Sequence, residues 1–215
     1  MNIINSFEKI KQEIKNHSTQ NEAEIIAVSK TFSIEHIMPL IEYGHIHYGE
    51  NKVQEAEKKW KELKKTRKNI KLHMIGRLQS NKAKKAIELF DYIHSLDNEK
   101  LANELFKRQK EKDKRINYFI QINLGSEDQK GGVEINDLTN FYDYCVKKLN
   151  LSVLGLMAIP PNDKEPEKHF KRMYELNKKL NLSQLSIGMS NDYSEAIKYG
   201  ASYIRIGTAI FGLRS

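Results

Sequence analysis

The chain has 215 residues, of which 39% are hydrophobic and 30% are charged. This length suits one large domain or two small ones, and the charged content suits a compact core surrounded by charged helices. No run approaches the roughly 18 apolar residues of a membrane span, and the N-terminal stretch lacks the continuous apolar segment of a secretory signal. The single cysteine, Cys145, cannot form an internal disulfide, so we expect an inert buried thiol and a cytoplasmic protein.

Basic residues are concentrated in one part of the chain. The formal net charge is +8, yet the segment Lys52–Lys85 alone carries thirteen Lys or Arg against three Asp or Glu. Such a segment is typical either of a nucleic-acid surface or of a solvated, lysine-rich helix face. Trp60 is the only Phe, Tyr or Trp within it that could stack on bases. We therefore favour the solvated face over nucleic-acid binding, and steering of an anionic ligand is a third interpretation.

Strand-like and helical patterns alternate along the chain. Met1–His17 predicts an amphipathic helix, whose apolar face consists of Ile3, Phe7, Ile10 and Ile14. Short apolar runs that predict strands follow at Glu24–Lys30, Gly44–Tyr48, Ile70–Ile75, Tyr92–Ser95, Tyr118–Asn123, Ser152–Met157, Gln184–Ile187 and Tyr203–Ile206. Stretches that predict helices lie between them, at Ile34–Glu42, Asn51–Lys65, Lys82–Leu89, Lys100–Lys112, Ile135–Leu149, Glu165–Leu180 and Tyr193–Tyr199.

This alternation predicts an α/β fold in which helices connect the strands of a parallel sheet. Eight such repeats favour closure into a single (β/α)8 TIM barrel with an extra N-terminal helix. No linker or change of composition divides residues 1–215, so we expect one domain. Because the loops that follow the strands of such a barrel meet at one rim, polar side chains at the strand ends are the candidates for function.

Lys30 closes the first predicted strand, Glu24-Ile-Ile-Ala-Val-Ser-Lys30. Burial at the end of an apolar strand disfavours a charged ammonium group and leaves the amine able to form a Schiff base with a carbonyl compound. The alternative is a surface lysine whose charge extends into water. Taken alone, this residue favours the surface interpretation.

Two glycine-containing segments follow the last two predicted strands, namely Ser186-Ile-Gly-Met-Ser-Asn-Asp192 and Arg205-Ile-Gly-Thr-Ala-Ile-Phe-Gly212. Small residues let backbone N–H groups approach an anion, and the loops after strands 7 and 8 form the usual phosphate site of this barrel. The alternative is that Gly188 and Gly207 only make turns, while Ser190 or Asp192 caps a helix. Because the two segments occur together, the sequence favours a phosphate site and simple turns equally.

The histidines give weaker signals. His45-Ile-His47 would place two imidazoles on one face of a strand, but the fifth and sixth strands add no histidine, so we expect no metal. His73 lies in the segment His73-Met-Ile-Gly-Arg-Leu-Gln-Ser-Asn-Lys82, where a hydrogen-bonded core histidine is favoured over a functional one. Ser80 in the same segment is a candidate helix N-cap.

Six segments, in order over nearly the whole chain, together resemble the pyridoxal 5′-phosphate homeostasis protein family. They are Ala27-Val-Ser-Lys-Thr31, Gly49-Glu-Asn-Lys-Val-Gln-Glu55, His73 to Lys82, Gly155-Leu-Met-Ala-Ile-Pro-Pro161, Ser186 to Asp192 and Arg205 to Gly212. No single segment is decisive, whereas the ordered set is highly specific. The resemblance implies a single barrel similar to the N-terminal domain of alanine racemase.

The resemblance also implies which residues contact the cofactor, pyridoxal 5′-phosphate. Lys30 would form a Schiff base with it, and Arg205 would face its pyridine nitrogen. The residues around the phosphate would be Gly188, Met189, Ser190, Gly207 and Thr208. The remaining residues that line the pocket would be Asn51, His73 and Met157.

A guanidinium beside the pyridine nitrogen opposes protonation of the ring and makes it a weaker electron sink. The racemase that the chain resembles supplies one acid–base group from a second domain, and a barrel of 215 residues leaves no room for one. We therefore expect a non-catalytic protein that holds the cofactor reversibly for intracellular vitamin B6 homeostasis, with apo-enzymes as recipients. A small pyridoxal-phosphate-dependent amino-acid racemase is the alternative, because a base opposite Lys30 is not excluded. We expect mainly a monomer.

Overall fold

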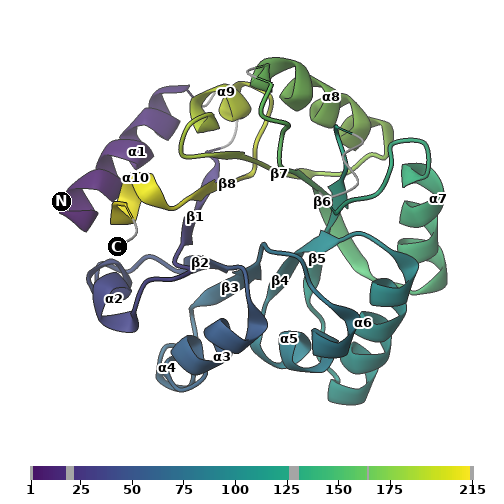
Figure 1. Cartoon of the computed structure of the whole chain (residues 1–215), viewed down its shortest axis with the longest axis horizontal. Coiled ribbons are helices and arrows are strands. Elements are labelled where there is room, and N and C mark those ends of the chain that lie inside the picture. Colours follow the sequence, from purple (N-terminus) through teal and green to yellow (C-terminus); the bar gives the residue numbers. More distant parts are fainter. Residues whose placement is uncertain (1, 18–21, 126–130, 164, 214–215) are drawn as a thin grey trace.

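The computed structural model describes residues 2–17, 22–125, 131–163 and 165–213. Eight parallel strands in these residues close into a barrel, in which each strand pairs with the next along the chain and the last pairs with the first (Figure 1). The strands are β1 (Glu24–Val28), β2 (His47–Glu50), β3 (Lys71–Met74), β4 (Tyr92–Leu96), β5 (Asn117–Ile122), β6 (Ser152–Ala158), β7 (Gln184–Met189) and β8 (Tyr203–Ile206). The predicted single (β/α)8 barrel is confirmed.

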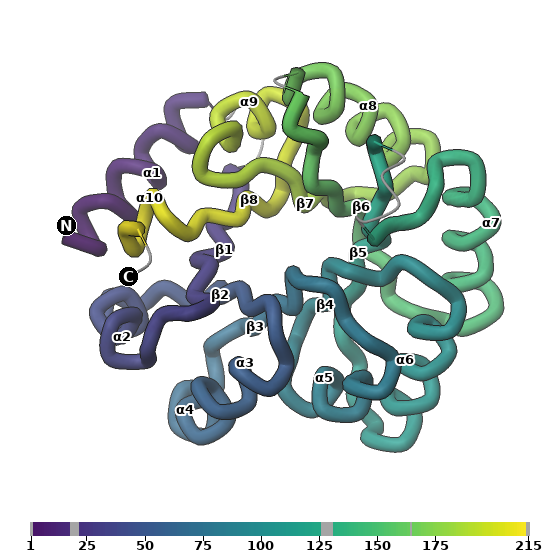
Figure 2. Tube along the Cα trace, viewed as in Figure 1, coloured from purple at the N-terminus to yellow at the C-terminus, as the bar shows by residue number. Residues whose placement is uncertain are grey.

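Helices surround the barrel on its outside, as the tube in Figure 2 makes plain. They are α1 (Ile3–His17), α2 (Ile34–Glu42), α3 (Val53–Trp60), α4 (Leu63–Thr66), α5 (Ala83–Leu89), α6 (Glu99–Lys112), α7 (Leu138–Asp143), α8 (Pro166–Lys179), α9 (Tyr193–Lys198) and α10 (Thr208–Phe211). The amphipathic patterns explain this arrangement for the longer helices α1, α2, α3, α6 and α8, in which apolar positions are buried.

The extra N-terminal helix is confirmed and completes the outer layer. Helix α1 packs against α10, α9 and α2, and Figures 1 and 2 both place α1 beside α10 at the junction of β8 and β1. Its apolar positions Phe7, Ile10 and Ile14 are buried, as the sequence pattern predicts. The hydroxyl of Tyr193 in α9 donates to Glu13, which fixes α1 to the other end of the chain.

Strand β2 begins at His47 and not at Gly44 as predicted. Gly44 has a left-handed φ of 99°, and the backbone N–H groups of Gly44 and His45 donate to carbonyls of Ile41 and Leu40 at the end of α2. These residues therefore terminate a helix, which is the usual role of a glycine with positive φ. As a result His45 and His47 do not share a strand face.

Three other sequence predictions differ locally from the structure. The helix predicted over Asn51–Lys65 is divided into α3 and α4, and the one predicted over Ile135–Leu149 becomes α7 followed by a π-helical turn, Tyr144–Lys148. Ser80 begins a 3-10 turn, Ser80–Lys82, whose N-cap is Gln79, so the expected cap at Ser80 is wrong. Such breaks depend on packing at helix ends, which the apolar period does not encode.

The core has an outer layer between the strands and the helices and a small apolar layer inside the barrel. The inner layer consists of Ile26, Phe119, Met157 and Tyr203. Cys145 belongs to the outer layer and is fully buried, which raises the pKa of its thiol to about 12. The predicted place in the core is confirmed, and the raised pKa supports the expectation of an inert thiol, since a neutral thiol is a poor nucleophile.

Many lysines of the basic segment are engaged in ion pairs within the fold. Lys64 contacts Asp91 at 2.6 Å, and Lys85 contacts Glu57 at 2.6 Å. Lys59 is buried against Glu50 at 2.9 Å. These pairs give several of the charges a structural partner. None of the helices that the structure describes is both long enough and apolar enough to cross a lipid bilayer.

Candidate functional site

Most of the predicted site residues lie at the carboxyl ends of the strands. Lys30 follows β1 by two residues and Asn51 follows β2 directly. Gly188 and Met189 end β7, and Ser190 follows them. Gly207 and Thr208 follow β8, which contains Arg205. Since all eight strands are parallel, these segments meet at one rim of the barrel.

A buried carboxylate, Glu50, anchors the backbone immediately before Lys30. Glu50 Oε1 accepts hydrogen bonds from Ser29 Oγ at 2.8 Å, Lys59 Nζ at 2.9 Å and Trp60 Nε1 at 2.9 Å. Lys59 Nζ also donates to the Ser29 carbonyl at 2.7 Å. We call Ser29, Glu50, Lys59 and Trp60 the Glu50 cluster. It fixes the residue immediately before Lys30 against β2 and α3.

Thr31, on the other side of Lys30, has a strained backbone. Its φ is 70°, which a β-branched residue rarely adopts. The backbone N–H of Thr31 donates to Glu55 Oε1 at 2.5 Å, and Glu55 in turn contacts Lys59 at 3.3 Å. The turn at Lys30 is therefore held in an unfavourable conformation by side chains of α3, which is the behaviour expected of a segment that positions a functional group.

The loops after β7 and β8 contact each other. The backbone N–H of Gly207 lies 3.4 Å from Ser190 Oγ, and Asp192 Oδ1 accepts from the backbone N–H of Met189 at 2.6 Å. Gly188 has a φ of 90°, and a Cβ there would lie 2.6 Å from the Cβ of Ala196, so this turn requires glycine. Gly188 therefore makes a turn, as one interpretation of the sequence predicts, and the loops after β7 and β8 also lie together, as the phosphate interpretation requires.

Gly207 is different, because the protein itself does not demand a glycine there. Its φ is −114°, and no atom lies closer than 3.5 Å to the place that a Cβ would take. The atoms nearest to that place belong to Val28 and lie at ordinary van der Waals distance. After β2, Asn51 Oδ1 is buried and has no hydrogen-bond partner among the described residues. An unsatisfied buried acceptor suits a polar ligand at this rim.

Arg205 supplies a buried positive charge beneath the two loops. Its Nη1 donates to the carbonyl of Ser186 at 2.6 Å and to Ser186 Oγ at 2.8 Å, and its Nη2 donates to the carbonyl of Ala158 at 2.8 Å. Burial lowers the pKa of Arg205 to about 10, and the charge of Asp192 opposes this shift. A guanidinium has five N–H donors, so Nε and one hydrogen of Nη2 are available to a ligand atom.

His73 and Met157 lie deeper than the rim. Met157 is fully buried among Ile26, Phe119 and Tyr203 in the inner layer. His73 is fully buried and lies 2.9 Å from a ring nitrogen of His47 on one side and of His94 on the other. This is the hydrogen-bonded core histidine that the sequence favours. Contact of His73 or Met157 with a ligand stays a prediction.

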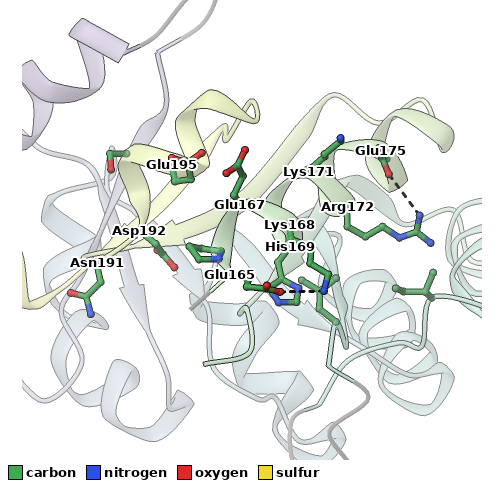
Figure 3. Close-up of a pocket in the computed structure, with 14 residues that line it drawn as sticks. Glu165, Glu167, Lys168, His169, Lys171, Arg172, Glu175, Asn191, Asp192 and Glu195 are labelled. Atoms are coloured by element: carbon green, nitrogen blue, oxygen red, sulfur yellow. Dashed lines mark hydrogen bonds and ion pairs between the residues drawn. The ribbon is translucent and has the colours of Figure 1, made fainter. Parts of the chain in front are cut away.

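A large groove on the surface is lined by none of the ten predicted cofactor residues. It has a volume of about 1050 Å3 and runs between α8, α9 and the loop after β7. Figure 3 shows Asn191 and Asp192 on one wall and residues of α8 on the other, where Lys168 pairs with Glu165 and Arg172 with Glu175. Its lining carries side chains of both charges.

Sequence reasoning missed the residues that support the site from behind. Glu50 lies in the segment Gly49–Glu55 and Lys59 in the basic segment, but the sequence predicts no role for either. Ser186 opens the glycine-containing segment at the end of the seventh predicted strand, and neither Ser186 nor His94 is predicted to have a role of its own. Ser186 and His94 are each a polar residue at the third position of an otherwise largely apolar strand, which is a sequence signal for an inward-facing polar group. The inward face of so short a strand cannot be predicted without the strand register.

Known proteins match this chain over almost its whole length. The family described as "Alanine racemase, N-terminal domain" matches residues 5–215. A pyridoxal phosphate homeostasis protein of Aquifex aeolicus is 40% identical over 204 residues, covering 91% of this chain and 89% of the relative. One of Haemophilus influenzae is 36% identical and covers 100% of this chain and 97% of the relative.

Solved structures agree with these matches. The structure of PipY of Synechococcus elongatus with pyridoxal phosphate bound has a TM-score of 0.88 and 31% identity, over 98% of this chain and 100% of that one. An alanine racemase of Clostridium difficile has a TM-score of 0.70 at 13% identity, and this chain covers 56% of it, so it supports the fold alone. With its barrel, its rim motifs and these full-length relatives, the chain belongs to the pyridoxal phosphate homeostasis protein family.

Proposed function

We propose that this chain binds pyridoxal 5′-phosphate reversibly, with Lys30 as the covalent anchor through a Schiff base, and takes part in vitamin B6 homeostasis without robust catalysis of its own. The observation that carries the proposal is the meeting of the strained Lys30 turn, buried Arg205 and the paired Ser190 and Gly207 loops at one rim. The relatives named as homeostasis proteins and the cofactor-bound PipY support the same ligand.

The residues of the rim fit the separate parts of this ligand. The Ser190 hydroxyl and the backbone around Gly207 and Thr208 offer donors for a phosphate. The remaining donors of Arg205 fit an unprotonated ring nitrogen, because a guanidinium cannot accept a hydrogen bond. The buried acceptor Asn51 Oδ1 fits a hydroxyl donor.

The charge of Arg205 also explains why binding without efficient chemistry is favoured. Bound pyridoxal phosphate would supply an electron sink, whose strength depends on a protonated ring nitrogen. The positive guanidinium opposes that proton, and its own pKa of about 10 keeps it charged at neutral pH. The rim therefore suits retention and release of the cofactor better than stabilisation of a substrate carbanion.

A titration of the purified protein with pyridoxal phosphate, followed by visible absorbance, tests the proposal. Wild type is expected to develop a Schiff-base band that Lys30→Ala loses entirely. Lys52→Ala is the matched control, because Lys52 is an exposed lysine close to the same rim. An unchanged band in Lys30→Ala, or no band in wild type, would contradict the proposal.

A pyridoxal-phosphate-dependent amino-acid racemase is the rival function and needs a separate assay. The loaded protein is incubated with single L-amino acids, and the products are separated by chiral chromatography. We expect no racemisation above that caused by free pyridoxal phosphate. Turnover at an enzyme-like rate that disappears in Lys30→Ala would favour the racemase.

A further inference from the structure

A continuous file of hydrogen-bonded side chains crosses the inside of the barrel and ends on Arg205. His47 Nδ1 lies 2.9 Å from His73 Nε2, and His73 Nδ1 lies 2.9 Å from His94 Nε2. His94 Nδ1 lies 2.8 Å from Ser186 Oγ, which accepts from Arg205 Nη1 at 2.8 Å. We call His47, His73, His94 and Ser186 the histidine file.

The file is almost entirely shielded from water. His73, His94 and Ser186 are fully buried, and His47 is 8% exposed at the amino end of β2. Two of the imidazoles stack on aromatic rings, His73 on Tyr92 with centroids 4.3 Å apart and His94 on Phe119 with centroids 4.4 Å apart. Interiors of such barrels are usually filled by branched apolar residues, so a polar file of this length calls for a role.

The direction of the hydrogen bonds follows from Arg205, which can only donate. Ser186 Oγ accepts from Arg205, and its single hydrogen then has one acceptor in reach, His94 Nδ1. His94 must therefore carry its hydrogen on Nε2 and donate to His73 Nδ1. The same rule makes His73 donate from Nε2 to His47 Nδ1.

A positive charge on the file would break this order. A protonated His73 would donate to both neighbours, which would force His94 to donate to Ser186 and leave the Ser186 hydrogen without an acceptor. Burial lowers the pKa of His73 and of His94, and the charge of Arg205 acts in the same direction on His94. Donor count, burial and the nearby charge of Arg205 thus agree on neutral rings.

We propose that the histidine file is a directional hydrogen-bond chain that positions Arg205, with each imidazole neutral and protonated at Nε2. Ser186 and His94 act as positioning residues, because they hold the guanidinium without reaching the rim themselves. The effect on the cofactor rests on the proposed function above. The tautomers do not, because they follow from contacts within the chain.

The tautomers are read from protein labelled with 15N-histidine, without cofactor, in a long-range 1H–15N spectrum with residue assignment. His73 and His94 are each expected to have a protonated Nε2 and an unprotonated Nδ1 at neutral pH. A proton on Nδ1 of either residue, or a doubly protonated ring, would overturn the proposal. Failure of wild type to bind pyridoxal phosphate would remove the proposed function and leave this result intact.

Ser186→Ala tests the positioning role, and Ser95→Ala is its control. Ser95 is also a buried serine of the barrel, but its hydroxyl has no hydrogen-bond partner among the described residues. Ser186→Ala is expected to mix the tautomers of His94 and to weaken pyridoxal phosphate binding about tenfold, as loss of a hydrogen bond to a charged group predicts. Ser95→Ala should change neither. Wild-type affinity together with wild-type tautomers in Ser186→Ala would refute the role.

Discussion

The Glu50 cluster and the histidine file are two buried polar networks that lie behind the same rim, one beside the end of β1 and the other beneath Arg205 in the neighbouring strand β8. The Glu50 cluster is ionic, because a carboxylate with no exposed surface is paired with Lys59. The histidine file is built from neutral rings and ends on the charged Arg205. One network holds the backbone beside Lys30 by charge, and the other holds Arg205 by the direction of its hydrogen bonds.

The difference has consequences for stability and for pH dependence. Removing one member of a buried ion pair leaves an uncompensated charge, which costs more than removing one neutral hydrogen bond. A neutral histidine network is sensitive to acid instead, since each ring resists protonation in the folded state. The two networks are therefore expected to respond to different perturbations.

The largest effect is expected for Glu50→Gln. The substitution keeps the shape of the side chain but leaves Lys59 with the partly exposed Glu55, at 3.3 Å, as its remaining carboxylate contact, so the free energy of unfolding should fall by about 3 kcal/mol. Urea denaturation measures this change. Glu62→Gln is the control, because Glu62 and its partner Lys65 are largely exposed and the change should stay within about 0.5 kcal/mol. Equal effects of the two substitutions would show that Glu50 is not a buried anchor.

A smaller effect is expected for Trp60→Phe. Phenylalanine keeps most of the apolar contact but loses the hydrogen bond from Nε1 to Glu50 at 2.9 Å. A bond to a charged acceptor is worth about 1.5–3 kcal/mol, which urea denaturation should detect. The matched variant is Tyr48→Phe, since the Tyr48 hydroxyl is buried without a partner in the described residues and its ring lies 4.8 Å from that of Trp60. A loss no greater than that of Tyr48→Phe would contradict the assignment.

The smallest change in the free energy of unfolding, counted per histidine and per pH unit, is expected when the pH is lowered. Burial lowers the folded-state pKa of His73 and of His94, so below about pH 6.5 the unfolded chain binds protons that the folded chain does not. The free energy of unfolding should decrease as pH falls from 7.5 to 5.5, by up to about 1.4 kcal/mol per pH unit for each ring. Denaturation curves at three pH values test this. His17→Gln, at an exposed helix end, should leave the slope unchanged. Equal stability at pH 7.5 and 5.5 would exclude neutral buried rings.

The fold was accessible from the sequence because the barrel repeats one simple pattern. Strand β8 and helix α2 have the predicted bounds. Gly207 follows the strand, and Ser33 is the N-cap of the helix. Gly44 misled the prediction of β2, because a glycine between a helix and a strand marks the end of one or the start of the other equally well. Packing decides between them.

The rim was also largely accessible, whereas the networks behind it were not. Lys30, Ser190 and Gly207 stand at strand ends, where sequence order alone predicts their location. The histidine file joins residues from β2, β3, β4 and β7 and ends on Arg205 in β8, and His94 and Ser186 are 92 positions apart. Such contacts depend on barrel closure and on which strand face points inward, and a local sequence pattern predicts neither.

Covalent mapping of the bound cofactor tests the central claim most directly. The protein is mixed with pyridoxal phosphate, reduced with borohydride and digested, and the modified peptide is identified by mass spectrometry. The account predicts a single stoichiometric modification on Lys30, absent from Lys30→Ala and unchanged in Lys52→Ala. Stoichiometric modification of another lysine, or scattered modification without preference for Lys30, would contradict it.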